Sequence, residues 1–143
     1  MPIGACWARA EVAAAFVPGD HGSTFGGQPL AAAAARAVLA VMERDDVPAR
    51  AARAGRRLQA ALAAVPGVRA VRGLGLLVAV ELDGADAKAV AAACLDAGLV
   101  VNAVTGTALR LAPPLLVSDE EIDEAVAVLT GVLATTAAAG AGG

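Results

Sequence analysis

Aromatic residues are scarce in this sequence of 143 residues, at 2% of the chain: one Trp, two Phe and no Tyr. A hydrophobic core must therefore be built from Ala, Val and Leu, whose small side chains bury little area each. Such a core needs closely packed helices or the surface of a partner, which favours an oligomer. The balance of 11 Lys and Arg against 14 Asp and Glu gives a net charge of −3, which argues against a nucleic-acid-binding surface.

Residues that bind metals are equally few. Cys6 and Cys94 lack the spacing of zinc ligands, and His21 is the one histidine, so no structural zinc site can be completed. We expect no metal, and we interpret both cysteines as small buried residues of a reduced compartment. His21 lies in a Gly-rich segment and is expected to be structural, so no catalytic residue is assigned.

The sequence shows no signal of a membrane or secretory segment. Its N-terminal residues do not combine a basic region with a long apolar run, so no signal peptide is predicted. Residues 125–143 carry no charge, but their large apolar side chains share one stripe, which predicts an amphipathic helix and a flexible tail rather than a membrane span. We expect a cytoplasmic protein without a membrane partner.

Apolar periodicity predicts alternating helices and short strands. A buried strand is expected at residues 1–8, and helices are expected at 9–16, 29–44, 46–65, 86–97 and from 118 onward. Further strands are expected at 68–71, 74–82, 99–103 and 107–112, the last two forming a hairpin. The short connections indicate an α+β fold, a small and mostly antiparallel sheet covered by helices. Asp46, Asp86 and Ser118 are predicted to cap helices, Ser118 in a capping box with Glu121.

One stretch combines glycines, hydroxyl side chains and a helix start. Residues 19–27 contain Ser23 and Thr24 between glycines, and Pro29 is suited to the first position of the helix that follows. A loop that ends at a helix N-terminus presents unpaired N–H groups to an anion, most often a phosphate. The residues alone leave two interpretations open, a phosphate site and an ordinary surface turn.

Three segments resemble one enzyme family in the right order. Residues 19–27 resemble the phosphate-contacting loop of the class III aminotransferases, the acetylornithine and ornithine aminotransferase group, which are fold type I enzymes dependent on pyridoxal 5′-phosphate. Residues 2–5 match the segment just after the family's Schiff-base lysine, and residues 110–115 match its C-terminal carboxylate-binding strand. Gln28 stands where the family usually has asparagine, and because glutamine is a poor helix cap, this departure puts the side-chain cap in doubt but not the phosphate contact.

The resemblance assigns roles to three residues. Thr24 would give a hydroxyl to the cofactor phosphate of the neighbouring subunit in a homodimer, and Ser23 would contact the substrate. Arg110 would hold the α-carboxylate of the substrate, because its guanidinium can bind a carboxylate with two hydrogen bonds and its neighbours Ala108 and Ala112 are too small to cover it. The alternatives are loop capping for the two hydroxyls and an ordinary exposed arginine.

The resemblance also implies a domain plan. Residues 1–28 would be the end of the large cofactor-binding domain, 29–136 the long helix and the C-terminal small domain, and 137–143 the tail. The pattern of helix 29–44 is apolar nearly all round, which suits burial in the complete enzyme. Without the large domain, this helix should expose apolar surface.

The implied activity is transfer of an amino group from N-acetylornithine to 2-oxoglutarate, a step of arginine biosynthesis. Phe25 and residues 101–102 favour acetylornithine, with ornithine and 4-aminobutyrate as the alternative donors. The Schiff-base lysine of the family lies a few residues before the segment that matches Met1, and Lys88, the one lysine, does not correspond to it. We therefore expect no catalysis by these residues alone, and a non-catalytic remnant or interaction module is the alternative from another class.

Overall fold

The computed structural model describes residues 3–20 and 22–140, and the chain divides into two compact units, residues 1–45 and 46–143. The first unit contains helix α1, Ala10–Ala13, and helix α2, Pro29–Arg44. The division predicted at residue 28 concerns the domains of a parent enzyme and stays a prediction. No described helix is both long enough and apolar enough to cross a membrane.

The described part of the first unit lacks the strand expected at residues 1–8. Residues 3–8 are exposed and unpaired, because no other strand lies within residues 3–20 and 22–45 to accept their backbone hydrogen bonds. Helix α2 begins at Pro29 as predicted, and Gln28 forms no side-chain cap. Of its residues only Ala31 is buried, while Leu30, Val38 and Leu39 are 70%, 58% and 62% exposed, so the expected apolar surface is present.

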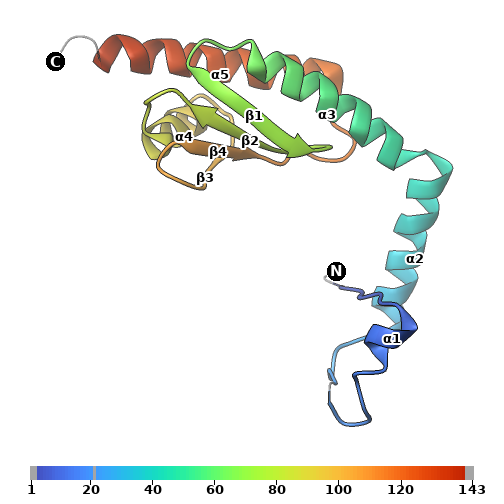
Figure 1. The fold of residues 1–143 in the computed structure, drawn as a ribbon. Helices are drawn as coiled ribbons and strands as arrows, with labels where there is room; N and C mark the ends of the chain where they lie inside the picture. The colour runs from blue at the N-terminus through green and yellow to red at the C-terminus, as the bar shows by residue number, and fades with distance from the viewer. Residues whose placement is uncertain (1–2, 21, 141–143) are drawn as a thin grey trace. The chain divides into compact units, whose positions relative to one another are not determined.

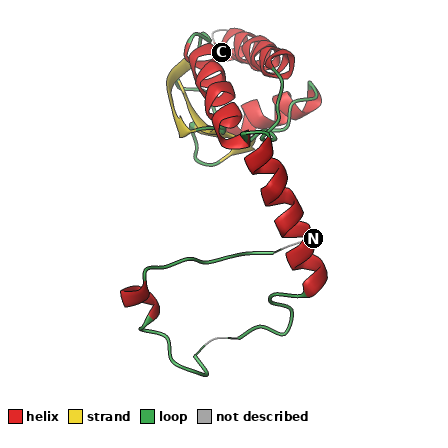
Figure 2. Ribbon diagram, turned by 90° about the vertical axis from the view of Figure 1, so that its right-hand side faces the viewer, coloured by secondary structure: helices red, strands yellow, loops and turns green. Residues whose placement is uncertain are grey.

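The second unit is the predicted α+β fold. Its elements are α3 (Val47–Ala63), β1 (Val68–Leu74), β2 (Leu77–Leu82), α4 (Ala87–Asp96), β3 (Asn102–Ala103), β4 (Ala108–Leu111) and α5 (Asp119–Gly140). The strands form one sheet in the order β1-β2-β4-β3, and every neighbouring pair is antiparallel. Helices α3, α4 and α5 lie on one side of this sheet, so its other face is open (Figures 1 and 2).

The core lies between the helices and the sheet and contains no aromatic side chain. The alternating residues Val78, Val80 and Leu82 of β2 are at most 1% exposed, and Leu62 and Leu129 from α3 and α5 are fully buried against them. Each such side chain contributes about 1.5–3 kcal/mol by leaving water. The three aromatic residues, by contrast, are exposed at Trp7 (88%), Phe16 (68%) and Phe25 (79%).

Two of the three predicted caps are confirmed. The Asp86 carboxylate accepts a hydrogen bond from the backbone N–H of Lys88 at 3.1 Å. Ser118 and Glu121 form the reciprocal bonds of a capping box, at 2.7 and 3.2 Å. The third prediction is wrong, because Asp46 adopts a left-handed backbone (φ 47°) and its side chain caps nothing.

The predicted hairpin is confirmed, but its first strand is shorter than residues 99–103. Only Asn102–Ala103 pair with β4, since the N–H of Leu99 is bound to the Cys94 carbonyl at the end of α4 and Val100 is 78% exposed. At the other end of the unit, α5 continues to Gly140, into the segment expected as a tail, and residues 141–143 lie outside the described residues.

Candidate functional site

The glycine-rich loop has the conformation that its sequence requires. Gly19 and Gly27 have φ angles of 99° and 69°, in the left-handed region that residues with a side chain rarely adopt. The Asp20 carboxylate accepts a hydrogen bond from the backbone N–H of Val17 at 2.9 Å, and the Asp20 N–H donates back to the Val17 carbonyl. These bonds close one turn at the start of the loop, and a second turn over residues 24–27 leads into α2.

Ser23 and Thr24 lie next to each other in this loop and are exposed. Among the described residues neither hydroxyl forms a hydrogen bond, so both can donate to a ligand. The first α2 hydrogen bond runs from the Ala32 N–H to the Gln28 carbonyl at 2.9 Å, which leaves the N–H groups of Leu30 and Ala31 without a partner inside the helix. Hydroxyls and helix N–H groups together are suited to an oxyanion.

A cavity of about 650 Å³ adjoins the loop within the first unit. Ser23 faces this cavity, and Thr24 is not among its lining residues. The lining brings together two of the segments singled out in the sequence: Ile3 and Gly4 from the first, and Ser23, Phe25, Gly26 and Gly27 from the loop, with Ala31 of α2. His21 lies outside the described residues.

Arg110 stands on the open face of the second unit's sheet. In the strand registers it is opposite Ala79 of β2 on one side and Asn102 of β3 on the other. Its side chain is exposed, and among the described residues it has no carboxylate partner. Ala112 is exposed as expected, whereas Ala108 is fully buried although alternation places it on the same face.

A shallow cavity of about 460 Å³ lies beside Arg110. Its lining also includes Arg72 and Gly73 of β1, Ala79 of β2, and Val104. Arg72 pairs with Glu81 of β2, so this face carries a second guanidinium that is already matched by a carboxylate. The sequence pattern does not indicate Arg72 and Glu81, because their proximity depends on the register between β1 and β2.

Among the described residues, the remaining reactive side chains do not form a site. Lys88 is exposed in the first turn of α4, in the second unit. Burial raises the pKa of the Cys94 thiol, which keeps it protonated and unreactive, whereas Cys6 is exposed, contrary to its expected burial. That expectation failed because the described part of the first unit has no paired strand to cover residue 6. The described residues contain no cluster of three or more His, Cys, Asp or Glu that could hold a metal.

The predicted site residues fall in two groups. Ser23 and Thr24 belong to the first unit, and Arg110 belongs to the second. The loop offers donors for an anion, and the sheet face offers a guanidinium for a carboxylate.

Comparison with known proteins identifies the family to which the chain belongs. The family model for class III aminotransferases matches residues 1–133. The chain is 48% identical over 134 residues to the acetylornithine aminotransferase of Corynebacterium efficiens, and 46% identical over 136 residues to that of Methanothermobacter thermautotrophicus. These matches cover 94% and 92% of this chain but only 33% and 35% of the two relatives.

Solved structures agree with the family match. An ornithine aminotransferase from Toxoplasma gondii superposes with a TM-score of 0.77 at 34% identity, covering 90% of this chain and 32% of that one. An acetylornithine aminotransferase from Elizabethkingia anophelis gives a TM-score of 0.73 at 30% identity, covering 87% and 34%. The chain thus spans about a third of the length of the relatives it matches.

The fold and the matched segments place the chain among the aminotransferases, enzymes that depend on pyridoxal 5′-phosphate. Within that class it belongs to the class III aminotransferase family.

The residues of this chain fit one end of that cofactor. The Ser23 and Thr24 hydroxyls and the start of α2 are donors of the kind that a phosphate accepts. The aldehyde end of the cofactor needs a lysine amine, and the chain's one lysine, Lys88 in the first turn of α4, does not correspond to the family's Schiff-base lysine.

Proposed function

We propose that this chain forms the C-terminal part of an acetylornithine-type aminotransferase, which moves an amino group from N-acetylornithine to 2-oxoglutarate in arginine biosynthesis. The observation that carries this proposal is the 48% identity to an acetylornithine aminotransferase along 134 residues. The complete enzyme is proposed to be a cytoplasmic homodimer whose partners are small amino-acid and oxo-acid substrates.

Each of the three site residues has a distinct proposed task. Thr24 donates its hydroxyl to the cofactor phosphate, across the dimer interface. Ser23, one residue before it, contacts the substrate, which agrees with its position in the wall of the cavity beside the loop. Arg110 binds the substrate's α-carboxylate with its guanidinium. This guanidinium is available because it is exposed and has no carboxylate partner among the described residues. When bound, pyridoxal 5′-phosphate supplies the electron sink for amino transfer.

Ornithine and 4-aminobutyrate aminotransferases are the alternatives within the family. The ornithine aminotransferase of T. gondii has a fold similar to that of this chain, but at 34% it is less identical than the acetylornithine enzyme of C. efficiens at 48%. Sequence identity therefore favours acetylornithine as the amino donor. A non-catalytic remnant that pairs with a complete aminotransferase is the alternative from another class.

Two chimeric enzymes test the proposal. In one, this chain replaces the C-terminal third of the C. efficiens acetylornithine aminotransferase, and in the other it replaces that of the T. gondii ornithine aminotransferase. Glutamate formation from 2-oxoglutarate is measured with N-acetylornithine, ornithine and 4-aminobutyrate as donors, with each unmodified parent as control. We expect the first chimera to be active and to prefer N-acetylornithine, and the second to gain activity with that donor.

The outcomes separate the alternatives. If donor preference follows the recipient enzyme in both chimeras, this chain does not determine the substrate. Chimeras that bind cofactor, by their visible absorbance, and yet turn over no donor would support the non-catalytic remnant. The coding sequence upstream of Met1 gives an independent test, since an in-frame lysine followed by a Gly-rich run supports an enzyme and a stop codon supports the remnant.

A further inference from the structure

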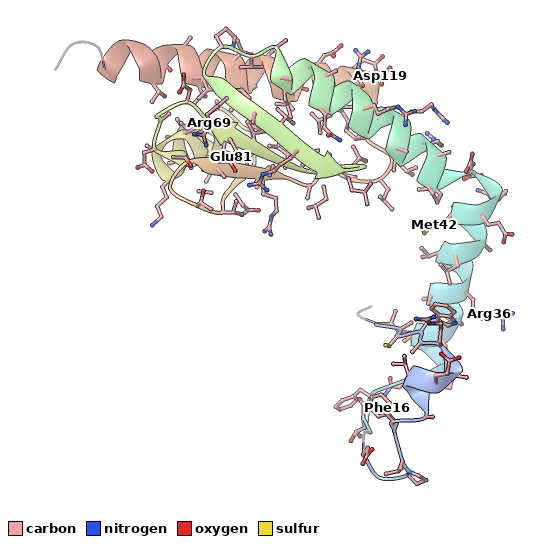
Figure 3. The ribbon with its side chains drawn as sticks, viewed as in Figure 1. Phe16, Arg36, Met42, Arg69, Glu81 and Asp119 are labelled. Carbon is pink, nitrogen blue, oxygen red and sulfur yellow. The ribbon has the colours of Figure 1, made fainter. Side chains whose placement is uncertain are left out.

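The open face of the sheet holds a cluster of charges that the proposed function leaves unexplained. Glu81 of β2 forms an ion pair and hydrogen bond with Arg72 of β1, and its other carboxylate oxygen lies 3.8 Å from a guanidinium nitrogen of Arg69. That second oxygen also lies 3.5 Å from the Thr107 hydroxyl, which donates to it. Arg69 and Glu81 can be followed on the sheet in Figure 3.

Glu81 is related to Arg72 and Arg110 in the same way. Arg72 on β1 and Arg110 on β4 are both opposite Ala79 of β2, one from each side. Glu81 lies two residues beyond Ala79 and therefore on the same face, so it is the diagonal neighbour of both arginines. Long side chains reach across such a diagonal, which makes either arginine a candidate partner for the one carboxylate.

The structure resolves this choice in favour of Arg72. The Glu81 side chain is only 15% exposed, so a close cation stabilises its carboxylate. Arg72 is that cation and donates a hydrogen bond to the carboxylate. Arg110 has no carboxylate partner among the described residues and borders the 460 Å³ cavity. Arg72, and more loosely Arg69, is thus matched by Glu81 within the fold, whereas Arg110 is left available.

We propose that Arg72 is a positioning residue for Arg110: by binding Glu81 on the β1 side, it prevents that carboxylate from occupying the guanidinium of Arg110. The inference rests on the proposed role of Arg110 as the carboxylate-binding residue. If Arg72 loses its charge, Glu81 is left as a mostly covered carboxylate whose remaining cations are Arg69 and Arg110. Pairing with Arg110 then competes directly with the carboxylate of the substrate.

Kinetics in the active C. efficiens chimera test this competition. Arg72→Gln is expected to raise KM for the amino donor about tenfold with little change in kcat, because an internal carboxylate competes with binding and leaves later steps alone. Arg72→Lys keeps the charge and should stay close to the parent. Arg69→Gln removes the same charge from the same strand, but from the looser contact at 3.8 Å, and should raise KM less than about threefold.

The double variant Arg72→Gln with Glu81→Gln separates competition from a merely structural role. Removing the competing carboxylate should restore KM to within about threefold of the parent, whereas damage to the sheet would persist or worsen. A KM unchanged in Arg72→Gln, or no recovery in the double variant, would overturn the inference. Thermal unfolding of each variant shows whether it is folded.

A second measurement on the 143-residue chain does not depend on activity. With ¹⁵N-labelled arginine, the Nε–Hε signal of Arg110 is identified by its loss in Arg110→Lys. Arg72→Gln should shift this signal and slow its exchange with water, and the double variant should reverse both effects, whereas an unchanged signal contradicts the inference. If the signal shifts but Arg110→Ala leaves kcat/KM of the chimera unchanged, the pairing is supported and the proposed role of Arg110 is wrong.

Discussion

Gly55, in the middle of α3, packs directly against the backbone of Gly75 in the turn between β1 and β2. A Cβ atom on Gly55 would lie 2.2 Å from the Gly75 carbonyl oxygen and 2.4 Å from its carbonyl carbon. The side chain of Gln59, one helical turn later, donates a hydrogen bond to the same oxygen at 3.3 Å. The close approach of helix and turn thus depends on the missing side chain at residue 55.

Gly55→Ala is therefore expected to lower the free energy of unfolding by about 3 kcal/mol, because backbone atoms cannot move aside as a flexible side chain can. Gly131→Ala is the matched control, since that glycine is also inside a helix but has nothing within 4 Å of its Cβ position. The control should gain about 0.5–1 kcal/mol from improved helix propensity. Urea unfolding followed by circular dichroism compares the two, and equal effects would refute the packing argument.

The capping box of α5 gives a second stability test. Ser118→Ala removes the acceptor of the Glu121 N–H and should cost about 1 kcal/mol. Gln28→Ala changes a residue at the same position of α2 that forms no cap, and should leave stability within about 0.5 kcal/mol. If Gln28→Ala lowers the free energy of unfolding as much as Ser118→Ala does, the loss at Ser118 cannot be assigned to its cap hydrogen bond.

The helix caps and the contact between Gly55 and Gly75 illustrate which features the sequence could predict and which it could not. The capping box at Ser118 and the helix beginning at Pro29 were predicted correctly, because their signals lie within a few neighbouring residues. The strand at residues 1–8 was predicted wrongly, because an apolar run becomes a strand only where another strand pairs with it.

The candidate site shows the same limit. Arg110 was identified through the resemblance of its own segment. The Arg72–Glu81 pair and the approach of Gly55 to Gly75 were missed, since each depends on a register or a packing distance between segments that the residue pattern does not encode.

Cys94 predicts a dependence of stability on pH. Burial raises the pKa of its thiol above the ordinary value of 9.0, so the folded chain retains a proton that the unfolded chain loses first. The stability that the protonated Cys94 thiol contributes is fully present below the pKa of the thiol in the unfolded chain. It is lost as pH rises from about 9 toward the higher pKa of the folded chain. Thermal unfolding between pH 7 and 10 should show a fall in Tm above pH 9 that is weaker in Cys94→Ala.

Thiol labelling checks the same residue independently. At neutral pH a disulfide reagent should modify Cys6, which is exposed, and spare Cys94 until denaturant is added. Rapid labelling of both thiols in the native chain would contradict the burial of Cys94.

Arg110→Ala tests the carboxylate site in the active chimera. Loss of a charged partner for the substrate carboxylate should lower kcat/KM by about a hundredfold, while the visible absorbance of the bound cofactor stays unchanged. Arg56→Ala is the matched control, since Arg56 is an exposed arginine of α3 in the same unit and outside the cavity beside Arg110. If both variants retain the parental kcat/KM, Arg110 does not bind the substrate.

The 143-residue chain alone is expected not to catalyse transamination. Amino transfer needs a lysine amine at the cofactor's aldehyde, and Lys88, in the first turn of α4, does not correspond to the family's Schiff-base lysine, while Ser23 and Thr24 supply only hydroxyl donors. Two hydroxyls and a few helix N–H groups contribute only about 1 kcal/mol per net hydrogen bond, so cofactor binding should be weak.

The test is to purify the chain, add pyridoxal 5′-phosphate, N-acetylornithine and 2-oxoglutarate, and follow glutamate formation. Free pyridoxal 5′-phosphate without protein gives the background rate, and Lys88→Ala is the control for any activity found. We expect the wild-type chain and Lys88→Ala both to remain at background. Turnover that exceeds the background and disappears in Lys88→Ala would show that Lys88 replaces the family's lysine, and turnover that persists in this variant would require another group to do so.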